Sequence, residues 1–369
     1  MTSFVFHGER LRLARVALGL TLEQLGARVS ATRQYLNQLE QGTKNPTEEM
    51  RDALADALGV AGHFFGCSAG NGIRPEQCHF RKQRMTPLAV VSQVLARGTL
   101  LDGVVSRLEQ ELDLPKVAFP DLPVSALHEV EEIADAARAH WRLGTGPISS
   151  MMRVVENAGA VVGFFGGVSE RVDALSIDAP RPLIIRSEAK PAVCRLRFDL
   201  GHEAGHLIMH QGVQTGDKET EDQANRFASA FLLPRSSFVH EFPRSRFLDW
   251  TRIFELKLRW KVSAAAILRR ANDLRMISAD QYRTGYIHLS KTGQKRQERY
   301  DDVMETETPE LLPRAVSALE KAYPGSIQRL IDETGLQREM FERVSGLALP
   351  ATKVHDHNVV SFRAPAKTG

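Results

Sequence analysis

Gly201 to His210 reads Gly-His-Glu-Ala-Gly-His-Leu-Ile-Met-His and carries the sharpest chemical signal in the sequence. Within it, His202, Glu203 and His206 form a His-Glu-x-x-His motif. On a helix, residues four apart project from one face, so the two imidazoles can bind one zinc ion. Glu203 then lies close enough to take a proton from a metal-activated water. The motif therefore predicts a helix, buried on one side, that carries a hydrolytic metal site.

A third protein ligand is expected, because catalytic zinc usually takes three and leaves the fourth position to water. One protease clan uses a histidine that would fall at position 212, where this chain has Gly212. His210 lies one turn beyond the motif, but three ligands on consecutive turns of one straight helix rarely converge, which favours a supporting role. The segment Thr220 to Pro234 offers Glu221 instead, one turn before the apolar stripe of a second helix. The alternative interpretation of Glu221 is a solvated acidic helix start.

These two stretches carry a resemblance to a known family. His-Glu-Ala-Gly-His followed by Glu-x-x-Ala-Asn-x-Phe-Ala-x-x-x-Leu-Leu-Pro resembles the ImmA/IrrE family of zinc endopeptidase domains, over about residues 122–290. The resemblance implies that the metal ligands are His202, His206 and Glu221, with Glu203 as the general base. Zn²⁺ is the cofactor expected, and Mn²⁺ or Fe²⁺ could occupy the same ligands.

The first 66 residues show the pattern of several short amphipathic helices. Thr21 and Gln24 form a capping box at the start of one helix, and Thr32 can cap the next, residues 33–39. Two short helices joined by a brief turn, the second with an exposed polar start, are the ingredients of a helix-turn-helix. The pattern closely resembles the phage-repressor (XRE-type) helix-turn-helix family over residues 4–65. By that resemblance, the residues that face DNA are Arg33, Gln34, Tyr35, Asn37 and Gln38, and those near its phosphates are Thr21, Lys44 and Asn45.

Two features of residues 1–66 differ from what strong DNA binding by this family would require. Leu22 stands where that family commonly has a glutamine, so one phosphate or base contact could be missing. Residues 1–66 hold 7 Lys or Arg and 7 Asp or Glu, so counterion release cannot supply much affinity by itself. The alternative is a helical protein-interaction module.

A separate segment, residues 235–300, is strongly basic. It holds 15 Lys or Arg and 6 Asp or Glu, and this excess of positive charge could assist DNA binding, hold an acidic effector or be a solvated face.

The fold class expected is mainly α with a small β-sheet: an N-terminal all-α helix-turn-helix domain, an α+β zincin-like peptidase domain and a helical C-terminal region. We expect a strand at residues 160–165 and a hairpin of residues 172–177 with 182–185, and either could accept substrate as an added strand. The expected helices of the peptidase and C-terminal regions are 124–141, a second ending at 158, 250–260, 263–274, 278–288, and helical structure over 307–347. The expected domains are 1–66 (helix-turn-helix), 67–122 (a connector whose long helix, 88–114, could mediate dimerisation), 123–290 (metallopeptidase), 291–350 (helical extension) and 351–369 (disordered tail).

Composition places the chain among ordinary soluble proteins. It has 369 residues, of which 43% are hydrophobic and 25% charged, enough for two or three domains. We expect no apolar run of membrane-spanning length, no signal peptide and no membrane partner, hence a cytoplasmic, nucleoid-associated protein. Cys67, Cys78 and Cys194 are widely spaced, which suits reduced thiols in that compartment.

We therefore expect a DNA-binding transcriptional regulator whose second domain is a zinc-dependent endopeptidase. The family precedent is cleavage of a repressor protein under stress, so cleavage of a partner regulator and self-cleavage are both open. The expected partners are a double-stranded DNA operator, read by a homodimer at two half-sites, and a protein substrate. Two alternatives remain: a repressor whose peptidase-like domain is a non-catalytic ligand sensor, and a domain whose zinc is purely structural.

Overall fold

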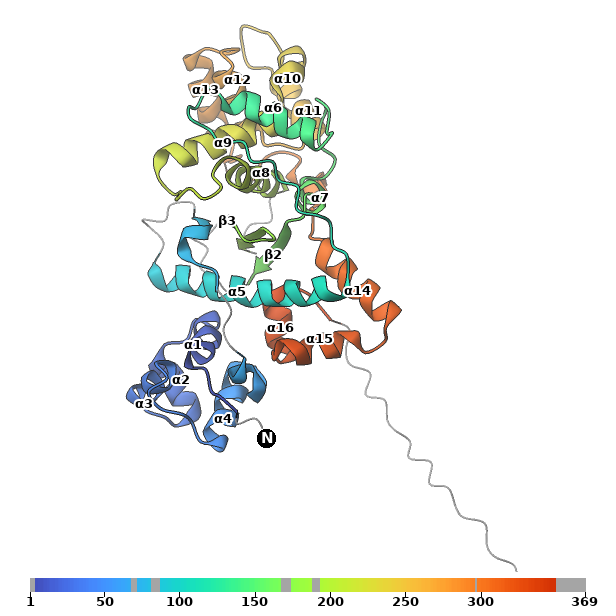
Figure 1. Cartoon of the computed structure of the whole chain (residues 1–369). Coiled ribbons are helices and arrows are strands. Elements are labelled where there is room, and N and C mark those ends of the chain that lie inside the picture. Colours follow the sequence, from blue (N-terminus) through green and yellow to red (C-terminus); the bar gives the residue numbers. More distant parts are fainter. Residues whose placement is uncertain are drawn as a thin grey trace, which may run out of the picture.

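The computed structural model describes residues 4–67, 72–80, 87–166, 174–187, 193–295 and 297–349. Helices predominate and one small mixed sheet accompanies them, as predicted from the sequence. Figure 1 shows the N-terminal helices at one end, helices α10 to α13 at the other, and the long helix α5 (Leu88–Glu111) crossing between them. The tail predicted to be disordered, residues 351–369, lies outside the described part of the chain.

The N-terminal unit consists of α1 (Gly8–Ala17), α2 (Leu22–Val29), α3 (Arg33–Glu40), α4 (Glu48–Leu58) and the 3₁₀ turn η1 (Gly62–Gly66). The capping box predicted at Thr21 and Gln24 is present, and the Thr32 side chain accepts a hydrogen bond from the Tyr35 backbone N–H. Helix α1 crosses the end of α3 so closely that a Cβ on Gly8 would lie 2.0 Å from the Leu39 carbonyl oxygen. The unit is therefore compact and leaves the start of α3 exposed.

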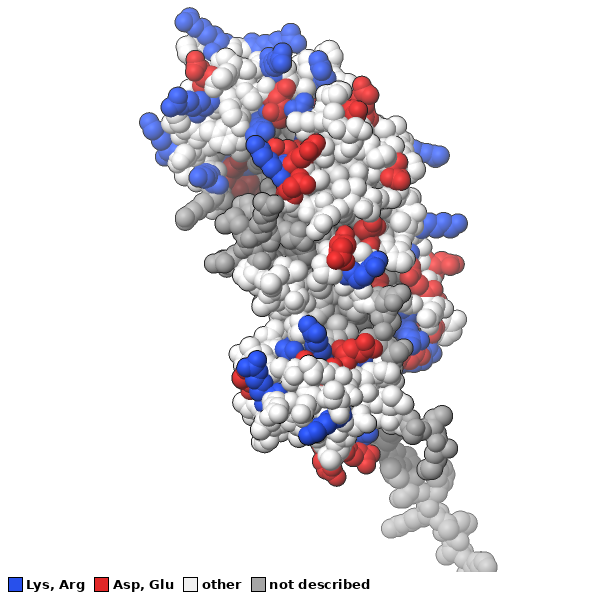
Figure 2. Space-filling model, turned by 60° about the vertical axis from the view of Figure 1, so that its left-hand side comes forward, with Lys and Arg blue, Asp and Glu red and all other residues white. Residues whose placement is uncertain are grey.

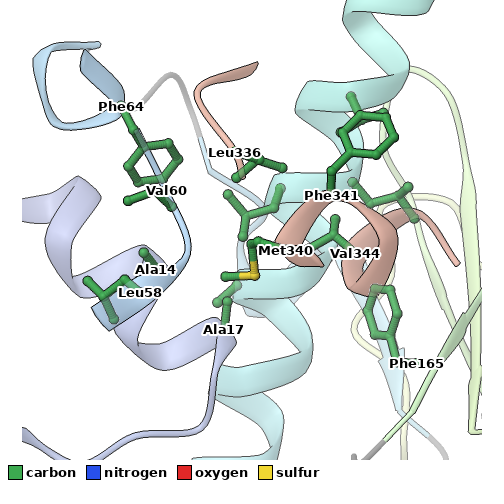
Figure 3. Close-up of a cluster of buried hydrophobic side chains, with 14 of the residues drawn as sticks. Ala14, Ala17, Leu58, Val60, Phe64, Phe165, Leu336, Met340, Phe341 and Val344 are labelled. Atoms are coloured by element: carbon green, nitrogen blue, oxygen red, sulfur yellow. The ribbon is translucent and has the colours of Figure 1, made fainter. Parts of the chain in front are cut away.

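The N-terminal unit docks on α5 and on the C-terminal helices α15 (Ser326–Thr334) and α16 (Arg338–Ser345), whereas α14 (Leu311–Ala322) packs on α5, α15 and β2. Figure 3 shows the shared apolar cluster, in which the labelled residues include Ala17, Leu58, Val60, Phe64, Leu336, Met340 and Phe341. Backbone pairing adds to it, because Ala61 N–H donates to the Gly335 carbonyl at 2.8 Å and Gln337 N–H to the Gly59 carbonyl at 2.9 Å. The N-terminal unit and the C-terminal helices thus share one core.

The sheet contains β1 (Cys78–Phe80), β2 (Val161–Phe165), β3 (Ala174–Ile177) and β4 (Leu183–Ser187), in the order β1-β3-β4-β2. β3 pairs antiparallel with both β1 and β4, and β2 pairs parallel with β4. β2 and the β3–β4 hairpin were predicted, although the first residues of the predicted hairpin, 172–173, lie outside the described ranges. β1 was not predicted, and it covers the outer edge of β3.

The sheet lies between two layers of helix, α5 on one side and α8 (Val193–Met209) on the other (Figure 1). Side chains alternate between the two faces of a strand. Leu175, Ile177 and Ile185 therefore join the apolar core that contains α5, whereas Val162 and Ile184 join the core that contains α8. The face of the sheet that carries Val162 and Ile184 is therefore the one that packs against α8.

Helix α5 corrects one expectation from the sequence. Among the described residues it is long and apolar enough to cross a membrane by length and composition alone, so the expectation that no segment reaches that length was wrong. Half of its most apolar window is buried inside the chain, as in the core helix of a compact protein. Arg97, itself buried in α5, donates to the Ala17 carbonyl at 2.8 Å and the Gly166 carbonyl at 2.7 Å, which ties α1 to the end of β2.

The other helices of the central and distal regions are α6 (Val130–His140), α7 (Met151–Asn157), α9 (Lys218–Leu232), α10 (Arg235–Glu241), α11 (Trp250–Trp260), α12 (Ala264–Asp273) and α13 (Ala279–Lys291).

The basic segment of residues 235–300 forms the distal end, where Figure 2 shows many Lys and Arg side chains on the surface. Part of this charge is internal, since the buried Lys257 ammonium lies 2.8 Å from Glu298 and 2.5 Å from Asp301. The distal end is remote from α3 (Figure 1), so its charge is not continuous with the helix-turn-helix.

Candidate metal centre

Helices α8 and α9 pack closely because small residues line their contact. A Cβ on Gly205 would lie 2.9 Å from the Phe227 ring, and one on Gly201 would lie 3.4 Å from the Ala228 Cβ. The start of α9 is capped by Asp217, whose carboxylate accepts the Thr220 backbone N–H at 2.8 Å. Close packing of this kind brings the first turn of α9 beside the middle of α8.

The structure brings the three predicted metal ligands together. His202 Nε2 and His206 Nε2 are 3.1 Å apart, and the Glu221 carboxylate oxygens lie 3.6 Å from the first and 3.5 Å from the second. A tetrahedral zinc ion with nitrogen and oxygen ligands at about 2.0–2.1 Å keeps those ligand atoms about 3.3 Å apart. The three atoms therefore have the chemistry and the spacing to hold one divalent ion.

The outer ring nitrogens of both histidines have partners that orient them. His202 Nδ1 lies 3.2 Å from Asn225 Oδ1, and His206 Nδ1 lies 2.9 Å from His210 Nδ1. His210 Nε2 lies 2.9 Å from Gln223 Oε1, and burial lowers the pKa of His210, which favours its neutral form. If His210 donates to the Gln223 oxygen, its Nδ1 accepts from His206, and both Nε2 lone pairs face the candidate metal position. His210 thus lies where a supporting residue would.

Glu203 lies in the same turn of α8 as His202 and is only 1% exposed. The Ser176 hydroxyl, on β3, donates to Glu203 Oε2 at 2.7 Å. Ser176 is fully buried and lies on the α8 side of the sheet, because Leu175 and Ile177 point to the α5 side. It was not predicted from the sequence, since a single serine in a strand carries no motif.

His79 on β1 also reaches this centre and was not predicted. Its ring stacks on that of His206 with 5.1 Å between centroids and 3° between planes, and it is 2% exposed. Its Nδ1 lies 2.9 Å from Thr215 Oγ1, and its Nε2 is buried without a hydrogen-bond partner among the described residues. Burial and the neighbouring His210 lower the pKa of His79 to about 4, which keeps the ring neutral at neutral pH.

A cavity of about 1000 Å³ lies near the centre, although none of His202, Glu203, His206 and Glu221 is among its lining residues. α8, α9, α12, α13 and the segment that follows α13 line it, with Asp199, Asn225, Arg226 and Tyr286 among the lining residues. Asn225 lines the cavity and also contacts the candidate centre, because its Oδ1 lies 3.2 Å from His202 Nδ1. Asn225 thus connects the candidate centre to a space at the upper end of the size range of small-molecule sites.

The residues predicted to meet DNA gather at the outer end of the N-terminal unit. Arg33, Gln34 and Asn37 are exposed on α3, where Arg33 makes an ion pair of 3.0 Å with the exposed Glu23. The remaining predicted residues are exposed or half-buried on α3 and the flanking loops: Thr21, Tyr35, Gln38, Lys44 and Asn45. The Lys44 ammonium lies 5.9 Å from the centre of the Tyr35 ring. Arg33 thus lies beside the start of α2 and Lys44 beside Tyr35, and none of the predicted side chains is buried.

Comparison with known families agrees with the two resemblances seen in the sequence. Residues 8–63 match the family model of a helix-turn-helix domain. Residues 155–272 match the peptidase family model described as the IrrE N-terminal-like domain, which includes α8, α9 and the three clustered side chains. A search of curated proteins found no significant match.

Proposed function

We propose that this chain, which joins a helix-turn-helix DNA-binding domain to an IrrE N-terminal-like peptidase domain, is a transcriptional regulator that acts by proteolysis. Its peptidase domain would be a zinc-dependent endopeptidase that cleaves a regulator protein, or the chain itself, in response to a stress signal. The observation that carries the proposal is the meeting of His202, His206 and Glu221 beside the buried Glu203. Zn²⁺ fits this donor set, and Mn²⁺ or Fe²⁺ could use the same atoms.

The chemistry divides between the metal and this chain's own residues. A bound divalent metal would polarise the scissile carbonyl and make an attacking water more acidic. Glu203 would take the proton from that water and deliver it to the leaving amine as the C–N bond breaks. The Ser176 hydroxyl, which donates to Glu203 Oε2, would hold the carboxylate in place while it takes and delivers the proton. The nearby cavity would receive substrate side chains.

The proposed partners follow from the two domains. The exposed start of α3 would read a double-stranded operator in the major groove, with Arg33, Gln34 and Asn37 as base readers. A homodimer would read two half-sites, and a cytoplasmic, nucleoid-associated location would follow from this role. Sedimentation of the purified chain with and without an operator duplex would measure the dimer directly.

The direct test of the proposed function uses the purified full-length chain. It is incubated with candidate repressor proteins in the presence of zinc, or with a chelator, and the products are identified by mass spectrometry. We expect a new amino terminus within a repressor, or within this chain, that appears with zinc and not with the chelator. Cleavage that persists in excess chelator would come from a contaminant or another mechanism and would contradict the proposal.

DNA recognition gives a separate prediction. Replacing Arg33 with alanine should weaken binding to a specific operator by about 10- to 100-fold, the loss of one base contact of about 1–3 kcal/mol. Arg12, exposed on α1, is the matched control, because Arg12→Ala removes the same charge away from α3. Fluorescence anisotropy with specific and random duplexes measures both variants. Equal losses for the two variants would mean that Arg33 contributes charge only.

The partners of the histidines give a prediction for metal affinity. Asn225→Ala removes the oxygen that orients His202, and His210→Ala removes the ring that orients His206. Each should lower zinc affinity by about 10- to 100-fold, the usual effect of losing such a support. Competition with a chromophoric chelator measures it. Gln211→Ala on the adjoining exposed turn is the control, and an unchanged affinity in both variants would show that these contacts do not tune the site.

One observation favours a second candidate function. The cavity of about 1000 Å³ near the centre is large enough for a metabolite, so the peptidase fold could act as a ligand sensor that performs no turnover. A small molecule that shifts operator affinity in a chain that never cleaves any candidate regulator would support the sensor. Chelator-induced unfolding without any cleavage would instead indicate a structural metal.

A further inference from the structure

The short strand β1 lies at the edge of the sheet that serves the candidate centre. It pairs antiparallel with β3, and Cys78, His79 and Phe80 stand opposite Ile177, Ser176 and Leu175. The turn η2 (Pro75–Gln77) precedes it and extends the contact, since Asp178 N–H donates to the Gln77 carbonyl at 2.7 Å and the Gln77 amide donates to the Asp178 carbonyl at 2.8 Å. β1 comes from the connector between η1 and α5, outside the segment that matches the peptidase family.

The face of this sheet edge that points toward α8 carries two side chains, Ser176 and His79, that contact the candidate metal centre. Ser176 on β3 holds Glu203, and His79, directly opposite Ser176, stacks on the candidate ligand His206. A chain added along the outer edge of β3 would therefore pass beside both the general base and the metal ligands. Extended peptides commonly bind proteins by adding a strand to such an edge.

We propose that β1 occupies the place on β3 where an extended peptide substrate binds, so that the connector keeps the peptidase site closed until it is displaced. This inference rests on the proposed function and names the substrate as a peptide segment in extended conformation, paired antiparallel with β3. The strand is three residues long, so its ladder on β3 is short, and His79 Nε2 is buried without a hydrogen-bond partner among the described residues. Leaving a buried polar atom without a hydrogen bond is unfavourable, which suits a strand that must leave.

The register supplies a reversible lock for testing this proposal. Cys78 and Ile177 stand directly opposite each other, and opposed Cβ atoms in antiparallel strands are about 4.5–5.5 Å apart, near disulfide range. Ile177→Cys, made in a Cys67→Ser background because Cys67 is exposed, can therefore be oxidised to fix β1 and reduced to release it. Ile177→Ser is the matched control that cannot crosslink. His79→Pro should instead weaken the pairing of β1 with β3, because proline removes a backbone hydrogen-bond donor from the strand. His79→Ala is its control, because it removes only the ring.

The probe is a fluorescent synthetic peptide with the sequence of residues 74–84 and serine in place of Cys78. Binding is measured by anisotropy in full-length, zinc-loaded protein that also carries Glu203→Gln, so that cleavage does not consume the probe. We expect His79→Pro to bind the peptide more than about tenfold tighter than the chain with an intact β1, because a tethered competitor acts at high effective concentration. Oxidation of the Ile177→Cys protein should abolish binding, and reduction should restore it. Oxidation should leave the Ile177→Ser protein unchanged.

The outcomes separate this inference from the proposed function. Equal peptide binding in the locked, reduced and His79→Pro proteins, all folded by circular dichroism, would overturn the inference and make β1 a fixed part of the sheet. Cleavage of a regulator at equal rates in the locked and reduced proteins, tested with Glu203 intact, would also overturn it while leaving the proposed function standing. Peptide binding gated by the lock in a chain that cleaves nothing would support the inference about the edge and count against the peptidase.

Discussion

Replacing Glu203 with glutamine is expected to lower the rate of peptide cleavage by about 10²–10⁴-fold, the usual contribution of a general base. Glutamine has nearly the same shape, so it can still meet the Ser176 hydroxyl that lies 2.7 Å from Oε2 in the wild-type chain. It cannot take a proton from water. The three clustered side chains are unchanged, so the variant should still bind one metal ion per chain.

The measurement is a time course of product formation with matched metal content in both proteins. Glu219→Gln is the control, because Glu219 is exposed in the first turn of α9 and the substitution makes the same chemical change outside the centre. We expect the control to cleave at the wild-type rate. A Glu203→Gln protein that cleaves at that rate would remove Glu203 from the chemistry.

Replacing Glu221 with alanine is expected to lower zinc affinity by more than about 100-fold. The reason is that losing a ligand should exceed the 10- to 100-fold loss that follows removal of a residue that only supports a ligand. Two imidazoles 3.1 Å apart would remain, without the carboxylate that approaches both of them at 3.5 and 3.6 Å. Cleavage should fall in parallel at limiting zinc.

Competition with a chromophoric chelator measures this loss, with Glu219→Ala as the control on the same helix. Circular dichroism checks that α9 still packs on α8, since Glu221 is in the first turn of α9 and not in its apolar face. If Glu221→Ala bound zinc as tightly as the wild type, the third ligand would be another residue, and the predicted two-histidine, one-glutamate set would be wrong.

The parts of the centre that could be predicted from the sequence are local ones. His202 and His206 lie four apart on one helix, so their shared face follows from spacing. Glu221 lies one turn before a clear apolar stripe and was a candidate ligand that the family resemblance favoured. The helices of the N-terminal unit follow from their caps and periodicity in the same way. Asn225 lay inside the motif that suggested the family, but its contact with His202 depends on how two helices pack.

The parts that could not be predicted depend on pairing between distant segments. β1 is three residues long and pairs with a strand about 100 residues later, which no local pattern can reveal. His79 and Ser176 reach the centre only through that pairing. The bridge between Val60 and Leu336, which joins the N-terminal unit to the C-terminal helices, spans a longer stretch of sequence still. The apolar length of α5 is by contrast a local property that the sequence contains, whereas its place beneath the sheet depends on the strands.

The most direct test of the central claim is anomalous diffraction from crystals of the full-length chain grown with zinc, recorded on both sides of the zinc absorption edge. We expect one strong peak about 2.0–2.2 Å from His202 Nε2, His206 Nε2 and a Glu221 carboxylate oxygen. A peak bound by other residues, or none at these three in crystals with one zinc per chain, would contradict it.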